Sequence, residues 1–196
     1  MSLPERLKGE FTTLSLVLMP IAIAINIVGG IFIVALKLPI YLDSIGTVLV
    51  GILVGPWAAA VTGALANIIW GLIMDPVAMP FAITSFFIGL TAGFLAKKGY
   101  FQTFGKSMIS GFCIGLVGAI VSTPIVVYLF GGVTSSGSTF ITAYLLATGK
   151  QLFFSVFSSS MLSDLADKLI TAGIAFYIAR NLPERIRSRF SQSTGA

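Results

Sequence analysis

The 196-residue sequence has no histidine, a single cysteine, and charged side chains at only 10% of its positions. The absence of histidine excludes His-based metal sites, catalytic triads and proton relays. The lone Cys113 excludes a disulfide within the chain, and its apolar surroundings favour a small buried or lipid-facing side chain. Soluble domains carry about 25% charged residues. With 56% hydrophobic residues and a mean hydropathy of +1.00, the sequence predicts one integral membrane domain over residues 1–196.

The few basic residues are concentrated near the two termini and in the middle of the chain. Nine of the twelve lie there: Arg6, Lys8, Lys97, Lys98, Lys106, Arg180, Arg185, Arg187 and Arg189. Because basic loops stay on the cytoplasmic side of a membrane, both termini and the loop 97–106 are expected to be cytoplasmic. The net charge of +5 is then explained by orientation and by lipid headgroups, which argues against a nucleic-acid partner.

Long charge-free runs predict the first five of six transmembrane helices, since a spanning helix needs about 20 apolar residues. The sixth expected span carries Asp164, Asp167, Lys168 and Arg180 and ends before Pro183. The expected spans are about 11–36, 44–55, 57–74, 78–96, 107–131 and 163–182. Gly55-Pro56 divides the second span from the third, because proline disfavours helix at the residue before it. The more polar segment 140–162 is expected to be helical and partly outside the bilayer. The predicted fold class is therefore an all-α integral membrane protein with six transmembrane helices, N and C termini cytoplasmic, and segments 37–43, 75–77 and 132–160 outside.

Small residues recur at four-residue spacing within the expected spans, which lets helix backbones approach closely in lipid. The first span carries Ala22, Asn26 and Gly30 at this spacing, with Ala24 beside them. Two interpretations remain open at this stage: packing within the bundle, or a groove that docks a helix of a partner protein.

Ionisable residues near the membrane are costly and are therefore candidates for function. Asp43 and Asp75 stand at expected helix starts, where an aspartate also caps free backbone amides. Asp164 and Lys168 are four residues apart and can pair on one helix face. Lys150 has no local partner, so it either reaches the lipid headgroups or meets an anionic ligand.

Polar and aromatic side chains gather toward the expected outer face. They form either an interfacial belt or, with the ionisable residues, an apolar pocket with a few polar groups for a small molecule. The candidate substrate-binding residues are Tyr41, Asp43, Asn67, Trp70, Tyr128, Lys150, Gln151, Asp164 and Lys168. No metal site is expected.

A nucleotide site of its own is also not expected. A phosphate-binding Walker A loop needs four residues between its two glycines, whereas Gly99 and Gly105 have five between them. Gly105-Lys106-Ser107 is therefore interpreted as a basic turn.

Several segments together resemble the substrate-binding S components of energy-coupling factor (ECF) vitamin transporters. They are Leu38-Pro-Ile-Tyr-Leu-Asp-Ser-Ile-Gly-Thr47, Leu53-Val-Gly-Pro-Trp57, Gly63-Ala-Leu-Ala-Asn67, Asp164-Leu-Ala-Asp-Lys168 and Leu182-Pro-Glu-Arg185. The resemblance implies a six-helix binding subunit of the bacterial plasma membrane that is not an enzyme and carries no cofactor. It implies capture of a vitamin or precursor outside, docking on a transmembrane coupling protein with two cytoplasmic ATPases, and delivery by reorientation in the bilayer.

The resemblance also implies where the substrate and the coupling protein bind. The loop after the first helix and helices 4 to 6 shape the site, which corresponds here to 37–43, the outer part of 78–96, and 125–168. An Ala-x-x-x-Ala motif of the first helix docks on the coupling protein, and the matching place reads Ala22-Ile-Ala-Ile-Asn26, with Asn26 in place of the second alanine.

The identity of the ligand stays open between two chemistries. Lys150 or Lys168 in the pocket would suit a carboxylate such as pantothenate, and the unpaired Lys150 favours this anion slightly. The aromatic residues with Asp43 or Asp164 would suit an aminopyrimidine such as the hydroxymethyl precursor of thiamine. A membrane enzyme, or a structural subunit that binds no small molecule, is the alternative; Asp164 and Asp167 lie on one helix and are poorly placed for catalysis between helices.

Overall fold

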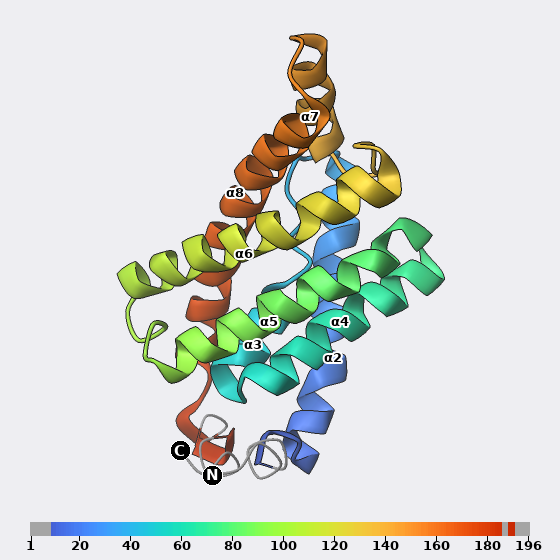
Figure 1. Cartoon of the computed structure of the whole chain (residues 1–196). Coiled ribbons are helices and arrows are strands. Elements are labelled where there is room, and N and C mark those ends of the chain that lie inside the picture. Colours follow the sequence, from blue (N-terminus) through green and yellow to red (C-terminus); the bar gives the residue numbers. More distant parts are fainter. Residues whose placement is uncertain (1–8, 186–187, 191–196) are drawn as a thin grey trace.

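A computed structural model describes residues 9–185 and 188–190 of the chain (Figure 1). Within these residues the regular structure is entirely helical, which confirms the all-α prediction. Three of the basic residues used to predict the orientation, Arg6, Lys8 and Arg187, lie outside the described residues. The elements are α2 (Thr13–Leu36), α3 (Ile45–Leu53), α4 (Pro56–Ile73), η1 (Pro76–Phe81), α5 (Ala82–Lys97), α6 (Phe104–Phe130), α7 (Ser138–Ala147) and α8 (Leu152–Asn181).

Four helical segments in the described part of the chain are long and apolar enough to cross a membrane. They are Thr13–Leu36, Pro56–Ile73, Pro76–Lys97 and Phe104–Phe130. Their outward surfaces carry large apolar side chains such as Phe32, Leu72 and Phe112, all exposed. Because lipid tails rather than water suit such surfaces, the chain is a multi-pass membrane protein.

The breaks between the first helices follow the local sequence. The division at Gly55-Pro56 is confirmed: α3 ends at Leu53, Gly55 has a φ of 146°, and Pro56 opens α4. A proline in the first turn lacks only an N–H that has no helical partner there. The short α3 is enclosed by its neighbours, and every residue in it except Ile52 is buried.

The last third of the chain differs from the expected pattern. The expected helix 140–162 is interrupted at 148–151, where α7 ends and Gly149 has a φ of 82°. The expected span 163–182 is the later part of one 30-residue helix, α8, that begins at Leu152. Polar residues in its first half hid its continuity, since hydropathy cannot separate a buried polar face from a loop. The six-span topology stays a prediction.

The two ends of the described chain lie at one end of the bundle (Figure 1). Leu14 and Leu18 from the start of α2 pack in one apolar cluster with Ala179, Leu182 and Phe190 from the end of the chain. A second cluster joins α3, α5, α6 and α8 deeper in the bundle.

Glu10 ties the beginning of the chain to this same end. Its side chain is only 2% exposed and accepts hydrogen bonds from the backbone N–H groups of Trp57 (2.7 Å) and Ala58 (3.1 Å). Lys97 at the end of α5 donates to its other carboxylate oxygen at 2.8 Å. A carboxylate thus meets the partial positive charge and the free amides at the N-terminus of α4. The sequence analysis gave Glu10 no role.

The four-residue spacing of small residues in α2 serves packing within the bundle. Ala22, Asn26 and Gly30 are buried, and Asn26 Oδ1 accepts from the Gly46 N–H at 2.7 Å while Asn26 Nδ2 donates to Thr47 Oγ1 at 2.8 Å. Of the four residues considered for docking, only Ala24 is exposed. The other three therefore present no surface to a partner in this structure, because α3 and Trp70 cover them.

The contact between α2 and α3 makes Gly46 sensitive to substitution. A Cβ at this position would lie 2.1 Å from the Ala22 carbonyl oxygen, so Gly46→Ala forces the two backbones apart. We expect a loss of about 1–3 kcal/mol in the free energy of unfolding, measured in mixed detergent–SDS micelles. Gly105→Ala is the matched control, because nothing lies within 4 Å of its added Cβ. Equal stabilities of the two variants would contradict this packing.

Candidate functional site

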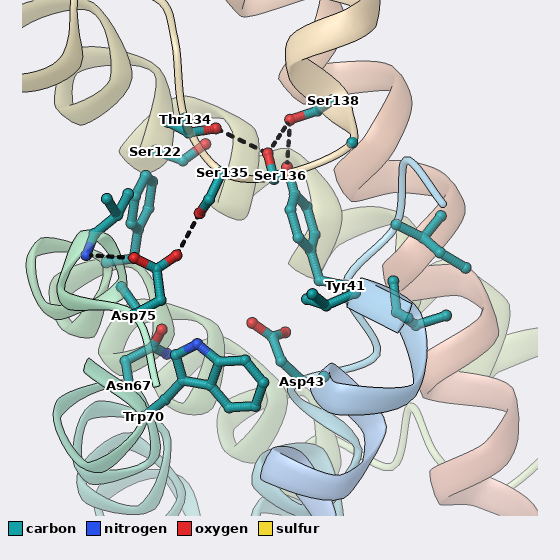
Figure 2. Close-up of a pocket in the computed structure, with 18 of the residues that line it drawn as sticks. Tyr41, Asp43, Asn67, Trp70, Asp75, Ser122, Thr134, Ser135, Ser136 and Ser138 are labelled. Carbon is teal, nitrogen blue, oxygen red and sulfur yellow. Dashed lines mark hydrogen bonds between the residues drawn. The ribbon is translucent and has the colours of Figure 1, made fainter. Parts of the chain in front are cut away.

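A cavity of about 520 Å³ lies between the loop 37–43 and the helices around it. Its wall is built from α2, α4, η1, α5, α6, α7, α8 and the hydroxyl-rich segment Thr134–Ser138 (Figure 2). Most of the wall is apolar, with Ile33, Phe81 and Val126 among its residues. Its volume is in the range that holds small-molecule ligands.

Six of the nine predicted substrate-binding residues line this cavity: Tyr41, Asp43, Asn67, Trp70, Asp164 and Lys168. The other three do not. Tyr128 is 79% exposed on α6, and Lys150 and Gln151 are exposed in the break between α7 and α8, where Lys150 Nζ lies 6.0 Å from the centre of the Phe154 ring. The structure thus brings together residues from three separate segments, loop 37–43, α4 and α8, and leaves Lys150, the favoured anion-binding lysine, outside.

The loop 37–43 is fastened to α8 by Asp167, whose side chain is 0% exposed. Its Oδ1 accepts from the backbone N–H groups of Tyr41 (3.1 Å) and Leu42 (2.7 Å). The loop also bends sharply, since Lys37 and Leu42 both have positive φ values, 52° and 49°. In the sequence, Asp167 was part of the segment Asp164–Lys168 that carries the resemblance, and it was otherwise considered as a poorly placed catalytic residue. Its hydrogen-bond partners lie more than a hundred residues away in the sequence, so no local sequence pattern predicts them.

Tyr41 connects the same loop to the start of α7. Its phenol donates a hydrogen bond to Ser138 Oγ at 3.2 Å (Figure 2). Burial and the nearby Asp164 carboxylate raise the pKa of Tyr41, so that the phenol keeps its proton and remains a donor. Loop 37–43 and segment 134–138 therefore meet over the cavity.

Lys168 is held by several partners and is nearly fully buried. Its Nζ donates to Ser44 Oγ at 2.7 Å, makes an ion pair with Asp167, and lies 3.5 Å from Asp43 Oδ1. Two expectations are corrected here. Lys168 pairs with Asp167 and Asp43 rather than with Asp164, and Asp43 faces this lysine instead of capping α3, where Ser44 is the N-cap.

Asp75 does cap a helix, as predicted: its Oδ1 accepts from the Val77 N–H at 3.0 Å at the start of η1. Ser135 donates to its other oxygen. Segment 134–138 lies within the stretch 125–168 that the resemblance implied for the site, but none of its hydroxyl residues was named as a candidate. Its hydroxyls also bond one another, with Ser136 Oγ 2.6 Å from Ser138 Oγ (Figure 2).

Two cavity residues have fewer partners than their chemistry allows. Asp164 is 4% exposed, and the hydrogen bond that reaches it from the described residues is a long one from Ser122 Oγ, 3.5 Å. Thr84 is 5% exposed, and its hydroxyl has no partner among the described residues. Buried polar groups are normally satisfied. These two groups therefore have unused hydrogen-bonding capacity in this structure.

The arrangement suits non-covalent binding. Within residues 9–185 and 188–190, no group of three or more His, Cys, Asp or Glu side chains is placed to hold a metal ion. Asp167 is occupied by the loop amides and by Lys168. What remains is an apolar chamber with a few polar groups aimed at its interior, which is the usual composition of a small-molecule site.

Comparison with known proteins agrees with the resemblance seen in the sequence. Residues 14–183 match the family described as the substrate-specific component of ECF transporters. No curated protein and no solved structure matches the chain. Members of this family are transporter subunits that bind substrate and are not themselves enzymes. Since the match covers most of the chain, including every helix that lines the cavity, the protein belongs to the family of substrate-specific components of ECF transporters.

Proposed function

We propose that this chain is the high-affinity binding subunit of an ECF-type importer in the bacterial plasma membrane, and that the cavity under loop 37–43 is its substrate site. The cavity itself carries this proposal. It is large enough for a vitamin or vitamin precursor, it is mostly apolar, and it brings Tyr41, Asn67, Trp70 and Asp164 together.

Six spans with both termini in the cytoplasm remain the proposed topology. The described ends of the chain lie at one end of the bundle, and Lys97 lies there too through its bond to Glu10. Loop 37–43 and segment 134–138 lie over the cavity, away from this basic end. This placement supports an extracellular cavity under the positive-inside rule. The two proposed spans that are not among the four long apolar helices are α3, which is short, and α8, which is polar on its buried face.

The proposed mechanism is binding followed by reorientation. Loop 37–43 closes over the substrate and is held by Asp167, and the loaded subunit then turns in the bilayer while docked on a transmembrane coupling protein. Two cytoplasmic ATPase subunits supply the energy, consistent with the lack of a Walker A loop. The exposed apolar face of α2, which includes Ala24, is the proposed docking surface in place of the buried Ala22, Asn26 and Gly30.

Of the two candidate ligands, the positions of the side chains favour the hydroxymethyl aminopyrimidine over pantothenate. The case for the anion depended chiefly on Lys150, which lies outside the cavity, and Lys168 is already compensated by Asp167 and Asp43. Aromatic rings and carboxylates, in contrast, do line the cavity.

Native mass spectrometry of the gently solubilised protein tests the proposal. We expect a vitamin-sized molecule to remain bound to the wild type. An empty protein that also fails to bind any member of a vitamin panel would favour the alternative of a structural subunit. Conversion of a bound molecule into a product would favour the alternative of a membrane enzyme.

Trp70→Ala is expected to weaken binding of the co-purified molecule about tenfold, because an aromatic contact in the cavity is lost. Isothermal titration of the emptied protein measures the dissociation constant. Trp57→Ala, at the opposite end of α4, and Lys150→Ala, outside the cavity, are matched controls that should leave this constant unchanged. A Lys150→Ala variant weaker than Trp70→Ala would move the site away from the cavity.

A further inference from the structure

Most of the unused hydrogen-bonding capacity of the cavity wall belongs to acceptor atoms. Among the described residues, one long bond from Ser122 reaches Asp164 Oδ2, and no hydrogen bond reaches Asp164 Oδ1. Asn67 uses its Nδ2 to donate to Ser85 Oγ and Gly63 O, and no described residue donates to its Oδ1. Acceptors left in this state call for N–H or O–H donors from a ligand.

The charges around the cavity point the same way. Three aspartates line it, Asp43, Asp75 and Asp164, against two lysines, Lys37 and Lys168. The buried Asp167 and the half-buried Asp43 already match the charge of Lys168, and Lys37 is exposed at the end of α2. The interior is therefore acidic, which favours a ligand that carries positive charge or polar N–H groups.

Thr84 provides an independent indication that a ligand completes this site. Thr84 lines the cavity and is 5% exposed, and its buried hydroxyl has no partner in the part of the chain that the structure describes. It comes from α5, whereas Asp164 comes from α8, and both residues line the cavity. The Trp70 ring lies in the same wall and offers an aromatic surface (Figure 2). Aromatic surfaces bind planar rings and cations well.

From this combination we propose that the cavity takes a planar heteroaromatic molecule with an amino group or a positively charged nitrogen, whose N–H groups donate to Asp164. The proposal rests on the proposed binding function and names the chemical class of its substrate. Asp164 is the residue that selects this class, Thr84 makes a further hydrogen bond to the ligand, and Trp70 packs against its ring.

Ligand pairs that differ at one group test the class. We would titrate the full-length wild-type protein in nanodiscs with 4-amino-5-hydroxymethyl-2-methylpyrimidine, with its analogue in which oxygen replaces the amino group, with thiamine, and with pantothenate. The expected result is binding of the aminopyrimidine or of thiamine, with pantothenate at least a hundredfold weaker. The oxo analogue should bind at least tenfold less tightly than the aminopyrimidine, because it loses the N–H donors.

Two variants connect this selectivity to the residues. Asp164→Asn keeps the shape of the side chain and should weaken binding of the amino ligand about tenfold to a hundredfold. Thr84→Val is nearly isosteric and should weaken binding several-fold while the unliganded protein keeps its melting temperature, since the lost hydroxyl had no partner. Thr171→Val is the control: its hydroxyl is also buried and unpartnered among the described residues, but it does not line the cavity. It should change neither property.

The experiments distinguish an error in the proposed chemical class of the ligand from an error in the proposed binding function. Tight binding of pantothenate, unchanged or tightened by Asp164→Asn, overturns the chemical class and leaves the binding function standing. No binding by any probe, together with no small molecule in the native mass spectrum, counts against both. If Asp164→Asn does not fold, two comparisons remain: Thr84→Val against the wild type, and the aminopyrimidine against its oxo analogue. Equal affinities in both comparisons overturn the proposal.

Discussion

Asp167→Ala is expected to lower the free energy of unfolding by about 3–5 kcal/mol, the usual loss when one partner of a buried ion pair is removed. Asp167 is wholly buried, and it satisfies two backbone amides of loop 37–43 as well as the ammonium of Lys168. Without it, Lys168 retains Ser44 and the more distant Asp43. Equilibrium unfolding in mixed detergent–SDS micelles measures the loss.

A double-substitution cycle separates the ion pair from the loop contacts. Lys168→Met removes the buried charge that Asp167 neutralises, so the double variant should lose less than the sum of the two single losses. Asp75→Ala is a control at the same end of the molecule, because Asp75 is only half-buried and bonds Ser135 and one backbone amide. Additive losses in the cycle would show that Asp167 and Lys168 act independently, against the geometry described here.

Glu10→Ala is expected to cost roughly 2–4 kcal/mol, measured in the same way, because it removes two charge-assisted bonds to backbone amides. The amides belong to Trp57 and Ala58, and Ala58 is completely buried, so water does not readily replace the carboxylate. The substitution should weaken the attachment of the start of the chain to the N-terminus of α4.

The ion pair of Glu10 with Lys97 should contribute much less than the amide bonds. Lys97 is half-exposed and regains water when its partner is lost. We therefore expect Lys97→Met to be nearly neutral. If Lys97→Met were as destabilising as Glu10→Ala, the salt bridge rather than the helix cap would be the main interaction at this end.

Sequence alone predicted well those helices whose ends are determined by nearby residues. Runs without charge gave α2, α4 and α6, and Gly55-Pro56 marked the division between α3 and α4 correctly. α8 was misjudged because Asp164, Asp167 and Lys168 interrupt its hydropathy while all three are buried within the bundle. Hydropathy averages over a helix, whereas burial of a polar side chain depends on neighbours from other helices.

Residue type alone predicted part of the site. The interaction partners of these residues could not be predicted, because they depend on the fold. Asp43, Trp70 and Asp164 were chosen by type and do line the cavity. Lys150 was chosen because it lacked a local partner, yet its surroundings at the break before α8 place it outside. Asp167 and Glu10 were passed over, since each acts on backbone amides far away in the sequence.

If loop 37–43 covers the substrate, as proposed, the bend at Leu42 affects how long a bound molecule stays. A leucine with a φ of 49° adopts a backbone conformation that costs about 1–3 kcal/mol, so the closed loop is under strain. Asp167 counters this strain by accepting the Leu42 N–H at 2.7 Å. For the proposed substrate site, the residence time of the ligand should then depend on the hydrogen bonds between Asp167 and this loop as well as on the cavity wall.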